Sequence, residues 1–400
     1  ARRAGRTAAA ARVQATQQAE RAKREADVAD RIAHFLVDLF HVPDPCESRG
    51  NEVTAREILD RGAEKIAEDA GMQPRVRARL MLTMSSSYRG LGFYEQAQPL
   101  AEQALATLNQ VAPKGDLDVA SALDVKGSLL KEQGKMREAK QTYEQALAIR
   151  RRYLPANSLG VAISLNNIGV CDYEDGRDAE AIPILEQALK IRKALLPLND
   201  LDVADSLMNL SLPLSNSENE ADRARARDML QDAIDVYRVK RPNSLDLAQA
   251  LNNLGVMYAE AEQYAQATPL MTEALHIHQH VLPAGHQDIG SDLMNIANVE
   301  LSEKRYDIAR LHFQEGLKIF ARAGIPDHQY FAYAKNNFAC LHIAVGQHAR
   351  GRQLHREALA ILDPSNPNHI NLAAQLEESF AGYLEEAGLH NEAVAAMERA

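Results

Sequence analysis

The sequence predicts an all-α fold: a right-handed solenoid of about eight repeats, each made of two amphipathic helices joined by a short turn. Two observations predict it. A small residue returns at a nearly constant spacing of 42 residues along most of the chain, and a fixed period of this length is typical of solenoids. Within each half-repeat, apolar residues follow the i, i+3, i+4, i+7 spacing of a helix that faces a core, as in Leu251, Leu254 and Tyr258.

We call the recurring small residue the anchor of its repeat. The residue before it is large and apolar in every repeat except the second, where it is Lys126. Small residues let two helices approach closely, and their large neighbours fill the remaining space. One repeat cannot bury its apolar face alone, so stability has to come from stacking. The anchors are Ser85, Gly127, Gly169, Ser211, Gly255, Ala297, Ala339 and Ala381.

Glycines and prolines mark the ends of the helices. A glycine follows most anchors by seven residues, where the first helix of a pair should end. A proline follows each second helix and cannot continue it. The fourth repeat departs most, because Pro213 falls inside its first helix. We expect a distorted or shortened helix there, a longer turn after it and a bend in the solenoid.

The segments ALNNLG (residues 250–255) and PL-x2-EAL (residues 269–275), with Tyr258 between them, resemble the tetratricopeptide repeat. The period of 42 residues is similar to the long variant found in kinesin light chains. The resemblance covers residues 70–400, which we expect to form the repeat array with a truncated last repeat. It implies a protein–protein interaction module and does not indicate a particular partner.

Two different segments precede the array. Residues 1–27 carry seven Arg or Lys against three Asp or Glu, and we expect a basic helical stalk. Residues 28–69 predict a helix pair that caps the array. Its first helix contains Val28, Ile32 and Phe35 on one side, and its second helix begins after Thr54, which has capping-box spacing to Glu57.

A second resemblance concerns residues 20–110. FLVDLF, followed by DP, RG and TAREILDRGAEKI, is similar to the segment between membrane helix and repeats in a group of bacterial serine/threonine protein kinases. It implies an upstream kinase domain and a sensory or docking role for this region on the extracytoplasmic side of the inner membrane. Without that context we expect a cytoplasmic scaffold. The chain starts without Met and stops in mid-pattern at Ala400, so we expect it to be part of a longer protein.

Net charge, cysteine content and the lack of long apolar runs argue against several classes of function. The formal net charge is −10, which argues against nucleic acid as a partner because its binding requires neutralised phosphates. Three cysteines, Cys46, Cys171 and Cys340, provide neither a disulfide framework nor a CxxC zinc site. No run of 18 apolar residues occurs, so no membrane span is expected. No catalytic motif or cofactor-binding motif is present, and we expect neither a cofactor nor a metal.

A ladder of asparagines is the strongest candidate site. Asparagine is unfavourable inside helices, so a register of five needs an explanation. One interpretation places these amides in a concave groove, where they pair with the backbone of an extended peptide. The other is that they bond across neighbouring repeats and stiffen the array. Two residues before the anchors stand Asn167, Asn209, Asn253, Asn295 and Asn337, with Asn166, Asn252 and Asn336 beside them.

Two further kinds of site, a clamp for carboxylate tails and a metal site, are less well supported by the sequence. A clamp for acidic C-terminal tails needs Lys or Arg one turn before the ladder, and Ile163, Asp205, Gln249, Ser291 and Tyr333 stand there instead. Two histidine groups suggest metal binding, but surface histidines are the simpler interpretation. The groups are His276, His278, His280 and His286, and His342, His348 and His355. A self-associating scaffold is the alternative to a peptide-binding module, so a homo-oligomer is conceivable.

Overall fold

The computed structural model describes residues 26, 28–35, 54–69, 71–322 and 329–400. Every regular element within these ranges is a helix, which confirms the all-α prediction. Residues 28–35 are helical and are followed by α2 (Ala55–Glu68). The predicted stalk, apart from residue 26, and the loop before Thr54 lie outside the described residues.

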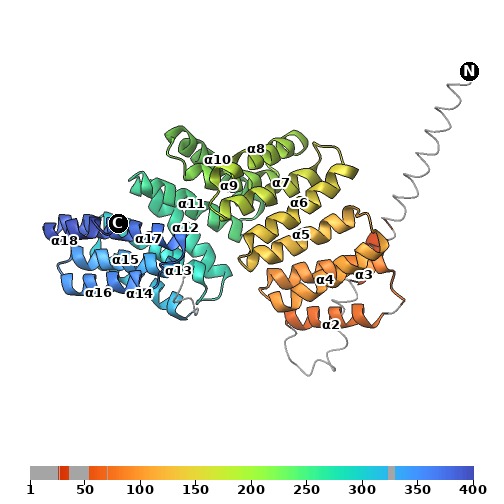
Figure 1. Cartoon of the computed structure of the whole chain (residues 1–400), viewed down its shortest axis with the longest axis horizontal. Helices are drawn as coiled ribbons and strands as arrows, with labels where there is room; N and C mark the ends of the chain where they lie inside the picture. Colours follow the sequence, from red (N-terminus) through yellow and green to blue (C-terminus); the bar gives the residue numbers. More distant parts are fainter. Residues whose placement is uncertain (1–25, 27, 36–53, 70, 323–328) are drawn as a thin grey trace, which may run out of the picture. The chain divides into compact units, whose positions relative to one another are not determined.

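The chain divides into two compact units between Leu195 and Leu196. Unit 1 contains α2 and the first three helix pairs (Figure 1). Val28 is buried in the core of this unit, with Ile32 and Phe35 packed against it. The pairs are α3 (Pro74–Gly90) with α4 (Tyr94–Val111), α5 (Leu117–Glu132) with α6 (Met136–Tyr153), and α7 (Leu159–Glu174) with α8 (Asp178–Leu195).

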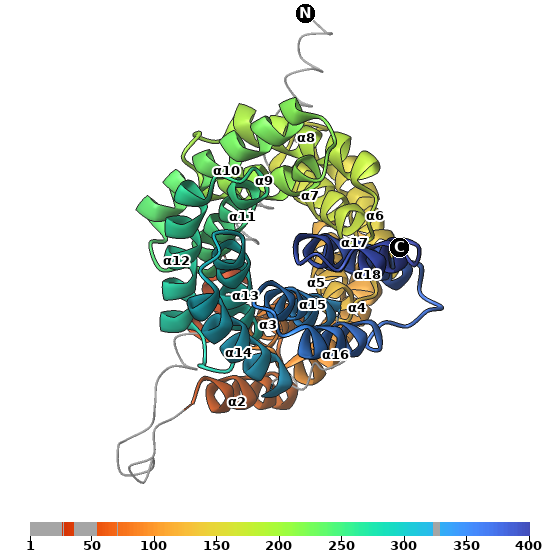
Figure 2. The ribbon, with the colours of Figure 1, turned by 90° about the vertical axis from the view of Figure 1, so that its left-hand side faces the viewer.

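Unit 2 contains the other five pairs. Figure 2 shows that its first helices follow the inner side of its curve and its second helices the outer side. The pairs are α9 (Leu201–Ser215) with α10 (Glu220–Lys240), α11 (Leu245–Glu260) with α12 (Tyr264–Val281), α13 (Gln287–Ser302) with α14 (Tyr306–Arg322), α15 (Gln329–Ala344) with α16 (His348–Leu359), and α17 (Pro367–Glu386) with α18 (His390–Met397).

The anchors are the points where the two helices of a pair come closest. A Cβ added to Gly169 would lie 2.6 Å from Cγ of Leu185 on the partner helix. At the first anchor, the hydroxyl of Ser85 donates to the carbonyl oxygen of Ala97 at 2.8 Å. The small residues predicted from the period are therefore required by direct contact between helices.

Local end signals also behave as predicted. Glu57 N donates to Oγ1 of Thr54 at 3.2 Å, and Thr54 N donates to Oε2 of Glu57 at 2.9 Å, which completes the capping box. The turn glycines have φ between 73° and 79°. Repeats five and six have Glu262 and Lys304 in that position, and both adopt the same left-handed conformation, with φ of 57° and 61°.

The fourth repeat accommodates two extra residues without losing its helices. Pro213 is buried near the end of α9, which has 15 residues against 16 in α11. The expected shortening therefore amounts to one residue. The turn after α9 has four residues against three after α11, and α10 has 21 residues against 18 in α12. Most of the added length extends the second helix.

Polar side chains at one register position connect successive repeats. Arg150, Arg192 and His278 each stand 23 residues after an anchor, and all three are buried. Arg150 donates to Ser164 of the next repeat at 2.5 Å. His278 Nδ1 lies 2.6 Å from Oδ2 of Asp292, also in the next repeat. Arg150 also pairs with the carboxylate of Asp124 in its own repeat, because an isolated buried charge is costly to desolvate.

The prediction of surface histidines is wrong for His278, His342 and His355, which are 3%, 8% and 3% exposed. His278 occupies the buried register position just described. His355 stacks on Phe380 at 4.0 Å between ring centroids and contacts Asn336 and Glu377. His276 and His280 are exposed, as predicted.

The last two repeats carry charge at a position where the first has methionine and the other five have leucine. Lys335 and Glu377 occupy the position of Leu251. Glu377 is buried, and Arg399 donates to it at 2.7 Å and 2.9 Å. His355 is held in the interior by these polar partners, Asn336 on α15 and Glu377 on α17.

Gly169→Ala tests the close approach at the anchors. Overpacking against Leu185 should outweigh the higher helix propensity of alanine, for a net loss of about 1–2 kcal/mol in the free energy of unfolding. Urea titration followed by circular dichroism measures it. The matched control is Gly382→Ala in α17, where nothing lies within 4 Å of the added Cβ, and which should gain up to about 1 kcal/mol. Equal effects of the two variants would contradict the close-approach explanation.

His278 and His342 predict opposite pH dependences of the free energy of unfolding. Burial acts to lower the pKa of His278, but the hydrogen bond and charge of Asp292 raise it overall. Burial lowers the pKa of His342, reinforced by Arg350 and Arg310 and opposed by Gln347. A raised pKa stabilises the fold at pH below the ordinary value and loses that effect as pH rises through the folded value. A lowered pKa removes stability as pH falls below the ordinary value.

His278→Gln should therefore cost most stability at about pH 5.5 and less at about pH 8.5. His342→Gln should relieve a penalty in the acidic range and leave the alkaline range unchanged. Thermal unfolding of both variants and the wild type across this range gives the difference curves. Difference curves of the same slope for the two variants would contradict the assignment.

Candidate ligand-binding groove

The eight asparagines lie on first helices but in different environments. Asn166 and Asn167 belong to unit 1, and the others to unit 2. Asn166, Asn336 and Asn337 are buried, and the remaining five are half-buried. Asn336 is fully buried against His355 and does not reach the groove. The structure brings Asn252, Asn253 and Asn295 together around one cavity.

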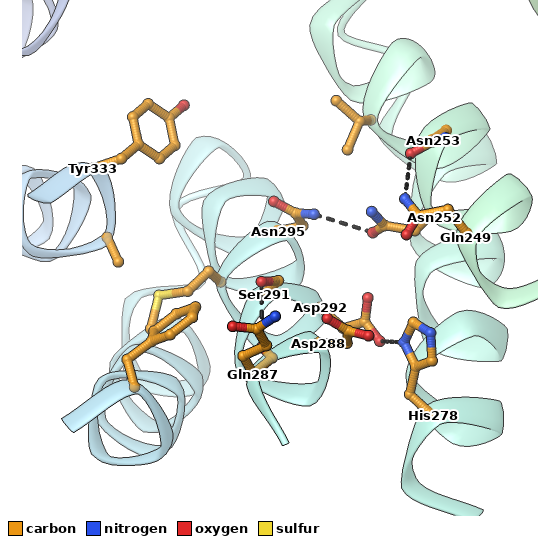
Figure 3. Close-up of a pocket in the computed structure, with 14 residues that line it drawn as sticks. Gln249, Asn252, Asn253, His278, Gln287, Asp288, Ser291, Asp292, Asn295 and Tyr333 are labelled. Atoms are coloured by element: carbon orange, nitrogen blue, oxygen red, sulfur yellow. Dashed lines mark hydrogen bonds and ion pairs between the residues drawn. The ribbon is translucent and has the colours of Figure 1, made fainter. Parts of the chain in front are cut away.

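This cavity, which we call the main cavity, has a volume of about 460 Å³ and lies between α11, α13 and α15. Figure 3 shows the amides of α11 on one side and Tyr333 of α15 on the other, with α13 between them. Its walls combine amides, carboxylates and apolar side chains. The lining residues are Gln249, Asn252, Asn253, Val256, His278, Gln287, Asp288, Ser291, Asp292, Met294, Asn295, Phe320, Tyr333 and Ala334.

Some ladder residues bond across repeats. Asn295 Nδ2 donates to Oδ1 of Asn252 at 3.0 Å, which joins α13 to α11 (Figure 3). Asn337 Nδ2 donates to Oδ1 of Asn298 at 2.9 Å, which joins α15 to α13. These two bonds are of the kind expected if the asparagines stiffen the array by joining neighbouring repeats. Each amide still has one polar atom outside the bond between repeats.

Asn253 has a different environment. Its Oδ1 accepts from Nε2 of Gln249 at 2.8 Å. Its Nδ2 is buried and has no hydrogen-bond partner. A buried donor without a partner costs about 1–3 kcal/mol, and such groups are few in native proteins. Gln249, which holds the oxygen of this amide, is itself exposed.

The charged groups of the main cavity are acidic or already paired. His278 and Asp292 bond each other, and burial raises the pKa of Asp292. The side chain of Asp288 is 39% exposed, and Nδ1 of His286 lies 3.5 Å from its Oδ2; this nitrogen accepts from Asp288 N. The lining contains no lysine or arginine. A cationic ligand group would therefore meet Asp288 without competition from a strong internal partner.

A smaller cavity of about 190 Å³ adjoins the main one. The two share Val256, Asn295 and Tyr333. The smaller cavity extends toward the C-terminal ends of α11 and α13. Its other lining residues are Ala259, Glu260, Tyr264, Met271, Asn298, Val299 and Ser302.

Sequence reasoning missed Asp288, although a register signal existed. Asp118, Asp202, Asp246 and Asp288 all stand nine residues before an anchor, in the first turn of a first helix. Acidic residues there are favoured by the helix dipole, so the pattern alone indicates stability. Arg75 pairs with Asp118 and Arg241 with Asp246. Asp288 differs from these two because it lines a cavity.

The other candidate sites can also be placed. Gln249, Ser291 and Tyr333, from the positions where a clamp needs basic residues, line the main cavity, while Asp205 accepts a hydrogen bond from Tyr237. Among the described residues, no group of three His, Cys, Asp or Glu side chains could hold a metal ion. Cys171 and Cys340 are buried, and burial raises the pKa of both thiols to about 12.

The bond between Asn252 and Asn295 should appear as a coupling energy. We expect Asn252→Ala and Asn295→Ala each to lower stability, and the double variant to lose less than the sum by about 0.5–1.5 kcal/mol. Urea unfolding of the four proteins provides the double-mutant cycle. Additive losses would show that this contact contributes nothing to stacking.

Comparisons with known proteins identify the repeat type. The tetratricopeptide repeat model matches residues 76–152 and 118–194, and a second tetratricopeptide repeat model matches residues 247–288. No curated protein sequence matches significantly. None of the described helices is long and apolar enough to cross a membrane.

Solved structures share the fold at low identity. A Rap protein complexed with competence and sporulation factor is 15% identical, with a TM-score of 0.64. The match covers 94% of this chain and 96% of the Rap chain. Aspartyl phosphate phosphatase F from Bacillus subtilis is 14% identical, with 93% and 92% covered and a TM-score of 0.58. The apo form of RapI is 16% identical, with 70% and 95% covered and a TM-score of 0.56. The chain is thus an all-helical solenoid that carries tetratricopeptide repeats.

Proposed function

We propose that the groove of unit 2 binds an extended segment of a partner protein and that the chain acts as a non-catalytic interaction module. The observation that carries the proposal is the unpaired, buried amide of Asn253 beside the main cavity. An amide that costs stability in the free protein is explained if a ligand supplies its partner.

The chemistry of the cavity suits a peptide backbone. Asn252, Asn253 and Asn295 offer amides that can donate to carbonyl oxygens and accept from N–H groups. Tyr333, Phe320 and Met294 provide apolar contact for a side chain. The volume of about 460 Å³ is within the usual range for ligand pockets, about 300–1,000 Å³. The groove would thus hold the backbone by amides and take one or two side chains into the cavity.

The structural relatives support a binding role for this fold. One Rap protein was crystallised in complex with competence and sporulation factor, so a solenoid of this kind can hold a second molecule. Another relative is an aspartyl phosphate phosphatase. For this chain we propose a non-catalytic role, since its sequence contains no catalytic motif.

The kinase context is part of the same proposal. Its support is the sequence resemblance over residues 20–110. In that context the groove would be the sensory or docking site of a bacterial serine/threonine kinase, on the extracytoplasmic side of the inner membrane. A kinase domain and a membrane helix encoded upstream in the same gene would be the deciding observation.

Self-association is the alternative function. In that case convex faces or the N-terminal segments of two copies would pair, and the groove would be secondary. Light scattering over a wide concentration range separates the two. A monomer at every concentration would remove the alternative, and a dimer that forms equally well after Asn253→Ala would leave the groove without a role in it.

Asn253→Ala should weaken peptide binding by about 5–30-fold, the equivalent of one or two hydrogen bonds. The probe is a random heptapeptide library displayed on phage and selected on the whole chain, with the recovered peptides titrated by fluorescence. Asn337→Ala is the control, because it removes an Asn bond between repeats at a residue that lines neither cavity. Failure to recover any peptide, or equal losses in both variants, would overturn the proposal.

A further inference from the structure

The two cavities of unit 2 indicate a direction for the ligand. An asparagine ladder would place a peptide across the first helices, from one repeat to the next. The cavities instead adjoin along the crevice between α11 and α13, where they share Val256 and Asn295. The available space therefore runs parallel to α13.

The length of this crevice fits a short extended segment. The cavities together reach from Asp288, in the first turn of α13, to Ser302, its last residue. Fourteen steps at 1.5 Å correspond to about 21 Å. An extended peptide covers this distance with about six residues.

The charge of the crevice is one-sided. Asp288 lines the main cavity and Glu260 lines the smaller one, near opposite ends of the crevice. Neither lining contains lysine or arginine, and His278 and Asp292 bond each other. Arg223, which lies outside both linings, acts on Glu260 through its charge, while burial raises the pKa of this carboxyl group. Two carboxylates in a concave surface whose lining has no lysine or arginine attract positively charged ligand groups.

The Asp288 end also contains the surface that a long cationic side chain needs. Figure 3 shows Tyr333 opposite the asparagines, with Asp288 on the helix between them. Phe320 and Met294 belong to the same cavity. The methylenes of lysine or arginine pack on such apolar walls while the charged head reaches a carboxylate.

We propose that the partner segment is short and basic, that it lies along α13, and that one cationic group meets Asp288 and a second meets Glu260. The proposal rests on the function proposed above and specifies its ligand. The two cations are separated by about five to seven residues of extended chain. Asn295, which both cavities share, contacts the backbone between them.

The test uses alanine–serine peptides that carry two lysines, with the separation varied from about one to about nine residues. The peptides are acetylated and amidated, and each is titrated against the whole chain by fluorescence anisotropy at low and high salt. We expect an affinity maximum at the intermediate separations. A parallel set with a free amino group and a single lysine tests whether the N-terminal ammonium can replace one side chain.

Asp288→Asn and Glu260→Gln should each weaken the best peptide by about tenfold at low salt, and less at high salt. Replacing one lysine of the peptide by norleucine should abolish the effect of one variant and preserve that of the other. Asp246→Asn is the control for Asp288, since it changes the equivalent aspartate of the preceding repeat, which pairs with Arg241. Glu262→Gln is the control for Glu260, because Glu262 is exposed and lines neither cavity.

The outcomes distinguish this inference from the function on which it depends. Affinity that does not vary with lysine separation, or an Asp288→Asn effect no larger than that of Asp246→Asn, would overturn the inference. If peptides from the random library then still lost affinity in Asn253→Ala, the proposed function would remain. If neither the lysine peptides nor the library peptides bound, both would be overturned.

Discussion

The structure depends on close packing between helices that cannot bury their apolar faces alone. At each anchor only a small residue lets the second helix approach, as the 2.6 Å separation between an added Cβ on Gly169 and Leu185 shows. The pair then stacks on the next pair. A polar group buried at a junction is costly unless it has a hydrogen-bond partner, which the neighbouring repeat can supply. Arg150 with Ser164, and His278 with Asp292, meet this requirement.

The asparagines of α11 and α13 include amides with a partner in the next repeat and one amide donor without any partner. Asn295 bonds Asn252 across repeats, and each keeps one polar atom outside this bond. Asn253, the next residue in sequence, has a buried donor without a partner. A contact that stiffens the array therefore lies beside the unpaired donor that carries our proposal of recognition.

The sequence predicted what depends on local pattern and period. Helix pairs, anchors, turn glycines and the capping box at Thr54 depend on residues within one repeat or on its exact recurrence. Contacts between repeats were harder to predict, because they join residues 14 to 43 positions apart whose relative rotation is set by stacking. His278 was predicted at the surface for this reason. Its register with Arg150 and Arg192 was the available signal for its burial.

The main cavity could not be predicted because it depends on side chains from three consecutive repeats. The residues six positions before the anchors differ from repeat to repeat: Ile163, Asp205, Gln249, Ser291 and Tyr333. The last three of these line the main cavity between α11 and α15. The repeats thus separate two tasks. Anchors and second helices preserve the solenoid, while the inner faces of the first helices can change their chemistry without disturbing it.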